Sequence, residues 1–213
     1  MKLIQFDDPH RKKHFDFFRS MDQPHFGITA DVEIDKFLSS LKEEGLPFTA
    51  TLVYLLSKAA NENTAFRWRL RDEQVVEHPS IQPSFTVLTQ VSEVFSFCTV
   101  KYNPDAMTFI RDAQRTMEEM QNTPSLEDEE GKDDFIFMSS FPWVSFRSMH
   151  HAMHYSPADS VPRISWGKYY NQGEKTLLPL AVQAHHALVD GKDMGHYYQA
   201  VQALLDEKEE WLS

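Results

Sequence analysis

The run KTLLPLAVQA, residues 175–184, constrains the fold of this chain more than any other stretch of its sequence. It is apolar at nearly every position, which predicts a central β-strand covered on both of its faces. Two histidines follow the run directly, and an Asp-Gly pair comes shortly after them. The run therefore predicts a buried middle strand that ends beside chemically reactive groups.

Five segments place apolar residues at helical spacing. The segment 34–45 carries one apolar stripe and ends at Gly45, a residue type that commonly stops a helix. The segment 48–63 is apolar almost all round, which predicts a buried helix. The other three are residues 10–21, the stretch after Pro104 that contains Ile110 to Met120, and the stretch from Met194 to Leu205.

The segment FRWRLR, residues 66–71, alternates strictly between apolar residues and arginines. This pattern predicts a half-buried strand with Phe66, Trp68 and Leu70 on one face and the arginines on the other. Further strand candidates are residues 84–91, 95–100, 135–146 and 163–170, while the acidic segment 122–134 predicts an exposed loop. Because no repeat or linker interrupts these elements, we expect one α/β domain, residues 1–213, built on a mixed sheet.

Charge and composition exclude several classes of partner. The chain has 21 Lys and Arg against 32 Asp and Glu, a net charge of -11, so it lacks the basic surface that nucleic acid requires. No apolar run approaches the length of a membrane span, and the first residues show no apolar signal core. Cys98 is the one cysteine, which suits a reducing compartment. We expect a cytoplasmic protein without a membrane or nucleic-acid partner.

The pair His185-His186, followed by Asp190 and Gly191, allows three interpretations. The histidines are ordinary residues at a strand end, or metal ligands, or one of them is a general base. Neighbouring side chains on a strand point to opposite faces, which disfavours one ion for both. The pair His150 and His154 has helical spacing but lacks the glutamate of a zinc-hydrolase motif and any cysteine partner, so no metal is expected.

The general-base interpretation rests on the chemistry of imidazole. Its unperturbed pKa lies near neutrality, so it can take a proton from a hydroxyl at physiological pH. A buried strand that ends at a turn before a helix, expected to start near Asp193, is a rigid place to hold it. The spacing alone leaves the three interpretations open.

The segment LLPLAVQAHHALVDG, residues 177–191, resembles the HHAxxDG signature of the chloramphenicol O-acetyltransferase family. Other family-like segments follow the same order along nearly the whole chain, namely HRKKHF, FRWRLRD, PSFTVLTQ, SSFPWVSF and GKYYNQGEK. The resemblance implies a two-layer α/β sandwich with a mixed β-sheet, the CoA-dependent acyltransferase fold. It also implies a homotrimer with active sites between subunits, and direct transfer of acetyl from acetyl-CoA to a hydroxyl without an acyl-enzyme.

The resemblance assigns roles to individual residues. It places the general base at His186 and the donor to the oxyanion at Ser139, although a strand-end serine is also commonly satisfied by local hydrogen bonds. It gives Ser165 a part in holding a bound water. It pairs Asp190 with Arg11 as an ion pair that braces the histidine corner, and it implies that a carbonyl sets the tautomer of the histidine.

The resemblance also predicts how the chain meets its co-substrate. Trp143 and Tyr169 match aromatic positions of the family's CoA channel, although both could equally belong to the core. Pro47 and Thr49 stand where relatives have a lysine and a tyrosine that contact CoA, so the details of CoA binding are expected to differ.

The acceptor pocket is where the chain departs most from the family. Phe26, Thr86 and Phe95 keep the family's character. Five positions do not. Relatives have small or apolar groups where this chain has Asp22 and His25, and they have a Phe, a Leu and a Val where it has Met149, His151 and Met153. Burying a histidine or carboxylate against the chlorinated group of chloramphenicol costs desolvation. The acceptor is therefore either chloramphenicol, with an antibiotic-resistance role, or a more polar alcohol.

Two other functions stay open at this point. The acyltransferase domains of 2-oxo acid dehydrogenases have a similar histidine and Asp-Gly, but normally follow lipoyl domains that this sequence does not show. The second is a non-catalytic trimeric binding protein. It is disfavoured because the chain keeps all four residues that the resemblance places in the catalytic machinery, namely Arg11, Ser139, His186 and Asp190.

Overall fold

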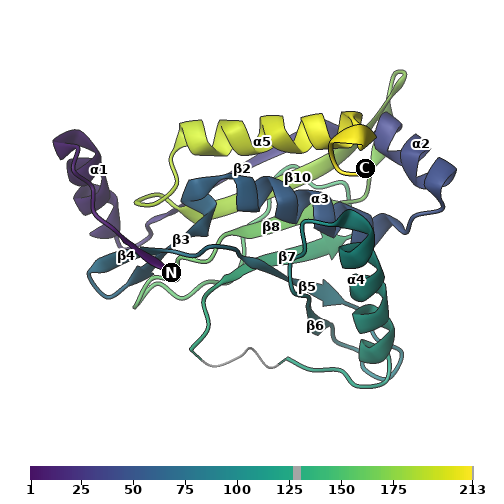
Figure 1. Ribbon diagram of the computed structural model, residues 1–213, viewed down its shortest axis with the longest axis horizontal. Helices are drawn as coiled ribbons and strands as arrows, with labels where there is room; N and C mark the ends of the chain where they lie inside the picture. The colour runs from purple at the N-terminus through teal and green to yellow at the C-terminus, as the bar shows by residue number, and fades with distance from the viewer. Residues whose placement is uncertain (127–130, 213) are drawn as a thin grey trace.

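The computed structural model describes residues 1–126 and 131–212, and a mixed seven-stranded sheet forms its centre (Figure 1). The strand order is β2-β10-β8-β7-β5-β6, with β9 also beside β10. The β5–β7 and β7–β8 pairs are parallel and the other pairs are antiparallel. The strands are β2 (His25–Glu33), β5 (Gln82–Val87), β6 (Ser96–Thr99), β7 (Phe135–Phe141), β8 (Arg163–Gly167), β9 (Tyr170–Gln172) and β10 (Lys175–His185).

The predicted central strand is β10, which lies between β2 and β8. Its residues are buried from Leu178 to His185, so both faces are covered, as the apolar run predicts. Leu178, Leu180 and Val182 belong to the hydrophobic core. The other face carries Gln183 and His185, which are 7% and 2% exposed.

Helices cover one face of the sheet (Figure 1). α5 (Gly191–Asp206) runs along β2 and β10, and α3 (Phe48–Glu62) packs between α5 and α4 (Ala106–Met120), while α2 (Asp35–Glu44) packs on α5 and β10. α3 is buried along most of its length, as its sequence predicts. α2 ends at Gly45, whose φ of 65° is a left-handed conformation that glycine adopts without steric cost. This arrangement confirms the two-layer α/β sandwich.

α1 (Pro9–Arg19) and a second, smaller sheet lie at one end of the molecule. α1 stands at the left of Figure 1, beside this small sheet of order β1-β4-β3. The strands of this sheet are β1 (Lys2–Ile4), β4 (Gln74–Glu77) and β3 (Trp68–Arg71). Among the described helices, none combines the length and the hydropathy of a membrane span.

The prediction for FRWRLR is wrong in two respects. Residues Thr64–Arg67 form a 3-10 helix, so the strand begins only at Trp68. Arg69 is fully buried rather than exposed, and its guanidinium donates to four backbone carbonyls, those of Phe66, Trp68, Asp133 and Phe135. An arginine can be buried when backbone acceptors take up its N–H groups, and alternation in sequence does not reveal those acceptors.

The acidic segment is also less exposed at its end than its composition predicts. Residues 127–130 lie outside the described part, but Asp133 is partly buried. Its carboxylate accepts from Arg71 at 2.6 Å and lies 2.8 Å from His78 Nε2. This loop end therefore fixes the small sheet to the start of β7.

The motifs SSFPWVSF and GKYYNQGEK are joined by a close approach of their backbones. A Cβ on Gly167 would lie 2.7 Å from the carbonyl oxygen of Val144, so only glycine fits there. Lys168 N–H donates to that same carbonyl, and Ser145 Oγ donates to the carbonyl of Lys168. The turn after β7 is thereby held against the end of β8.

Candidate active site

His186 follows β10 directly and is held from three sides. Its backbone N–H donates to the carbonyl of Pro24 at 2.8 Å. Its ring stacks on Phe18 at 3.8 Å and on Phe26 at 4.3 Å between ring centroids. Its Nδ1 is buried, and within the described residues it has no hydrogen-bond partner, so the expected carbonyl is not found there. The plane of the imidazole is therefore set by stacking rather than by a hydrogen bond.

Arg11 braces the turn that follows His186, but not in the expected way. Its Nη2 donates to the carbonyls of Ala187 at 2.9 Å and Leu188 at 3.0 Å. Its guanidinium also lies over the ring of Phe6, 4.4 Å from the centroid. The predicted ion pair with Asp190 is absent from the ion pairs of the described residues, so this prediction is wrong.

Asp190 instead caps α5. Its carboxylate accepts from Lys192 N–H at 2.8 Å and Asp193 N–H at 2.9 Å, while Asp193 accepts from the backbone N–H of Asp190. This reciprocal capping box starts the helix at Gly191, earlier than predicted. Burial opposes ionisation of Asp190, but those backbone N–H groups and the nearby Arg11 lower its pKa overall. The Asp190 carboxylate accepts from backbone N–H groups and the Arg11 guanidinium donates to backbone carbonyls, which explains why the two do not form an ion pair.

Four predicted residues meet in one hollow of about 160 Å³. Ser139 at the end of β7, Thr86 on β5, Phe95 and Trp143 all line it. The structure records no hydrogen bond of the Ser139 hydroxyl to any described residue, so the alternative of a locally satisfied serine is not supported. The hydroxyl is free to donate to a bound molecule.

Trp143 and Tyr169 are surface residues and not core. Their exposed fractions are 65% and 48%. Each follows the carboxyl end of a parallel strand, because Phe141 and Gly167 are register partners on β7 and β8. The two aromatic residues therefore lie at one edge of the sheet. The ring of Tyr169 lies 6.1 Å from that of Phe48, next to a hollow of about 350 Å³ that Pro47 and Thr49 also line.

His151 and Ser165 contact each other. His151 Nε2 lies 2.8 Å from Ser165 Oγ, and the backbone N–H of His151 donates to Gln183 Oε1 at 3.2 Å. Gln183 in turn donates to the sulfur of Met153 at 2.8 Å. The sequence did not single out Gln183, whose buried place in an apolar strand was the available signal. Two further residues predicted for the pocket are Met149, which is partly buried, and Asp22, which is exposed just before β2.

His25 turns inward. Its Nε2 lies 2.5 Å from the carbonyl of Asp159, and its ring is 5.2 Å from that of His185. Burial lowers the pKa of His25, and it lowers the pKa of His185 and of His151 to about 4. Burial also lowers the pKa of His14, whose ring is 5.5 Å from His186. These histidines are neutral at pH 7 and add no positive charge around His186.

Within one chain, His186 and Ser139 are far apart. Ala181 on β10 pairs with Ser165 on β8, which pairs with Ser139 on β7. Two strand spacings and five residues of strand rise put the Cα atoms of Ser139 and His186 roughly 19 Å apart. A single chain therefore does not bring the predicted base and the predicted oxyanion donor to one reacting carbonyl.

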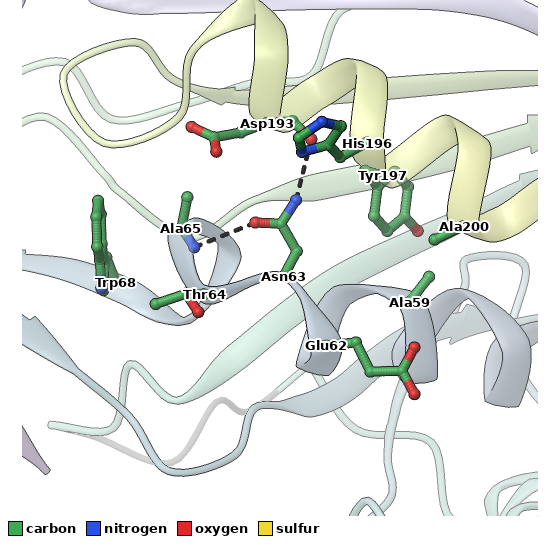
Figure 2. Close-up of a pocket in the computed structure, with 10 residues that line it drawn as sticks. All are labelled: Ala59, Glu62, Asn63, Thr64, Ala65, Trp68, Asp193, His196, Tyr197 and Ala200. Atoms are coloured by element: carbon green, nitrogen blue, oxygen red, sulfur yellow. Dashed lines mark hydrogen bonds between the residues drawn. The ribbon is translucent and has the colours of Figure 1, made fainter.

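A separate hollow of about 340 Å³ lies between α3 and α5 (Figure 2). None of the predicted site residues lines it. Figure 2 shows Asn63 in its wall, where the amide donates to the carbonyl of Asp193 and accepts from Ala65 N–H. Asn63 thus ties α3 to the first turn of α5. No group of three or more potential metal ligands occurs in residues 1–126 and 131–212.

Solved structures share this fold. A chloramphenicol acetyltransferase superposes with a TM-score of 0.84 at 24% identity, and the match covers 96% of this chain and 99% of the other. A probable dihydrolipoamide acetyltransferase from Listeria monocytogenes superposes at 0.69 with 16% identity, covering 100% of this chain and 96% of that protein. At these identities the likeness establishes the fold alone.

Sequence relatives establish the family. Chloramphenicol acetyltransferase of Proteus mirabilis is 32% identical over 92% of this chain and 91% of its own length. Chloramphenicol acetyltransferase 3 of Escherichia coli is 29% identical, covering 93% of both chains. The family model described as chloramphenicol acetyltransferase matches residues 1–202. The chain belongs to the chloramphenicol acetyltransferase family and is an acyltransferase.

Proposed function

We propose that residues 1–213 form one acetyl-CoA-dependent O-acetyltransferase domain, in which His186 is the general base. The observation that carries this proposal is the position of His186, whose imidazole is clamped between Phe18 and Phe26 at the end of the buried central strand. No carboxylate contacts this ring in the part of the chain that the structure describes. A rigidly held imidazole of this kind is suited to remove a proton from a hydroxyl.

His186 Nε2 takes the proton of the acceptor hydroxyl, and the hydroxyl oxygen then attacks the thioester carbonyl of acetyl-CoA. Ser139 donates a hydrogen bond to the oxyanion of the tetrahedral intermediate. When the intermediate collapses, the C–S bond breaks and the imidazolium returns its proton to the CoA thiolate. A fixed donor to the oxyanion contributes about 3 kcal/mol, and this role is supported by the Ser139 hydroxyl, which has no hydrogen-bond partner among the described residues.

The active enzyme is a homotrimer in which one copy supplies His186 and its neighbour supplies Ser139. The separation of roughly 19 Å within a chain, from standard strand geometry, supports this assembly. Apolar side chains are also exposed near both residues: Phe17 is 60% exposed at the His186 end, and Val144 is 57% exposed beside Trp143. Contact between copies would cover such patches.

Trp143 and Tyr169 are the side chains that would hold acetyl-CoA. Both are exposed at the sheet edge where β7 and β8 end, the same edge that carries Ser139. The ring of Tyr169 lies near Phe48, which lines a hollow together with Pro47 and Thr49. Because neither of these two residues offers the charge or ring that relatives have there, the contacts to CoA are expected to differ.

Chloramphenicol is the first acceptor to test, because the relatives carry its name. A more polar alcohol is the second candidate. His151 and Ser165 place polar atoms on the sheet face that carries Ser139, and Arg163 pairs with Asp159 on that same face. An acceptor that forms hydrogen bonds would offset the desolvation of such groups better than a chlorinated one.

The chemistry is tested by incubating the protein with acetyl-CoA and either chloramphenicol or a panel of small polar alcohols, and following the release of free thiol. His186→Ala is expected to lower turnover by about 10²–10⁴-fold. His196→Ala, at an exposed histidine on α5, is the matched control and keeps turnover. Near-normal turnover by His186→Ala would overturn the mechanism, whereas activity on another alcohol alone would overturn only chloramphenicol as acceptor.

Complementation tests the shared active site. His186→Ala and Ser139→Ala chains are each nearly inactive, but mixed trimers made by co-expression contain one intact site. Random mixing of equal amounts restores about a quarter of wild-type activity if each site joins two subunits. No recovery in mixed assemblies, or a mass that is not three times that of the chain, would contradict the trimer.

A further inference from the structure

His151 belongs to segment 142–162, which joins β7 to β8, and it contacts the sheet face that the helices leave open. Ser165 on β8 is fully buried, and its Oγ lies 2.8 Å from His151 Nε2. The backbone N–H of His151 donates to Gln183 Oε1 on β10. His151 is thus attached to two neighbouring strands at once, which fixes its position over Ser165.

Ser165 is the direct neighbour of the oxyanion donor. Ser139 and Ser165 are register partners on the parallel strands β7 and β8, so their side chains point to the same face. Adjacent strands are about 4.8 Å apart, which places the two hydroxyls side by side. Of the two, Ser165 has a protein partner, while the Ser139 hydroxyl is not hydrogen-bonded to any residue that the structure describes. Three polar groups therefore stand in a row, from His151 through Ser165 to Ser139.

A serine hydroxyl has a single proton, so its partner decides where that proton points. Burial, with smaller contributions from Arg163 and His150, lowers the pKa of His151 to about 4. The imidazole is therefore neutral at pH 7, and its Nε2 either accepts from Ser165 or donates to it, according to the tautomer. If Nε2 accepts, the Ser165 proton is fixed toward His151 and the lone pairs of Oγ face elsewhere; if Nε2 donates, one lone pair is taken and the proton points away from His151.

We propose that His151 is a positioning residue of the acyl transfer, which fixes the direction of the Ser165 hydroxyl beside Ser139. This inference rests on the proposed function. The oriented hydroxyl then presents a constant hydrogen-bonding group to the reacting centre, where the oxyanion and the acceptor meet. A fixed dipole at such a centre favours the transition state because it needs no reorientation during the reaction. An aliphatic side chain at position 151 would leave the Ser165 hydroxyl without a partner and free to turn.

The test is a double-mutant cycle on His151→Leu and Ser165→Ala, with turnover measured on the acceptor that reacts fastest in the thiol-release assay. Each single variant is expected to lower kcat roughly tenfold while changing the KM for acetyl-CoA by less than about twofold. The double variant is expected to be no slower than the slower single variant, because His151 acts through Ser165. His151→Gln, which can still contact the hydroxyl, is expected to recover part of kcat.

His150→Leu is the matched control, since the same substitution is made one residue away at an exposed histidine. Its kcat is expected to equal that of the wild type. An unchanged kcat for His151→Leu, losses that multiply in the double variant, or a drop in thermal stability without a drop in kcat would each overturn the role of His151. Wild-type protein that acetylates none of the alcohols overturns the proposed function instead, and the two failures are thereby distinguishable.

Discussion

The corner that holds His186 depends on Arg11 and not on an Arg11–Asp190 ion pair, and this difference can be measured. Arg11→Met removes both hydrogen bonds from Nη2 to the carbonyls of Ala187 and Leu188. A hydrogen bond from a charged donor is worth about 1.5–3 kcal/mol, and the carbonyls left behind lose their partner. We expect Arg11→Met to lower the free energy of unfolding by about 3–4 kcal/mol and to lower kcat as well.

Asp190→Asn is expected to be mild by comparison. Asparagine keeps an oxygen that accepts from the N–H groups of Lys192 and Asp193, and it caps helices about as well as aspartate. The change removes the negative charge at the start of α5, which costs about 0.3–1 kcal/mol. A direct buried ion pair would behave differently, because removing either partner would cost about 3–5 kcal/mol.

The assay is equilibrium unfolding in urea at one protein concentration, since the stability of an assembly depends on concentration. Asp190→Ala is the control, because it deletes the cap entirely and is expected to cost about 1–2 kcal/mol. The expected order of destabilisation is Arg11→Met, then Asp190→Ala, then Asp190→Asn. If Asp190→Asn destabilises the protein as much as Arg11→Met, the capping explanation is refuted and the ion pair exists in solution.

Two further predictions concern catalysis and pH. Ser139→Ala should reduce kcat about 10²–10³-fold in the thiol-release assay with little change in unfolding, and a kcat within twofold of the wild type would exclude Ser139 as the oxyanion donor. Burial lowers the pKa of His185 from 6.5 to about 4 in the folded state, so the unfolded chain binds the proton more tightly between these values. Stability from this neutral histidine is complete above pH 6.5 and falls as the pH drops toward 4, by roughly 3 kcal/mol in all. In urea unfolding, His185→Gln should reduce the difference in the free energy of unfolding between pH 7 and pH 4.5. An unchanged difference would show that His185 is not the cause of the acid loss.

Local patterns were sufficient for much of the fold. The apolar run 175–184 predicted β10 because a strand buried on both faces needs apolar side chains at successive positions. The helical stripes predicted all five helices for the corresponding reason. β2 escaped prediction because it is an edge strand with a single buried residue, so HFGITADVE shows no strong alternation. The HHALVDG segment, combined with PWVSF and GKYYNQG, was specific enough to predict the family that the comparisons confirm.

Sequence patterns were therefore enough to predict the layered fold, the family and the residue types available for chemistry. The partners of those residues became known only from the three-dimensional arrangement. Arg11 reaches carbonyls 176 and 177 residues further along the chain, and Arg69 reaches one 64 residues away. Hydropathy patterns record which side of an element is apolar, but a hydrogen bond depends on where two distant segments meet in space. The distance between His186 and Ser139 could not be predicted for the same reason. Strand order and register set this distance, and no local sequence pattern reveals the order or the register.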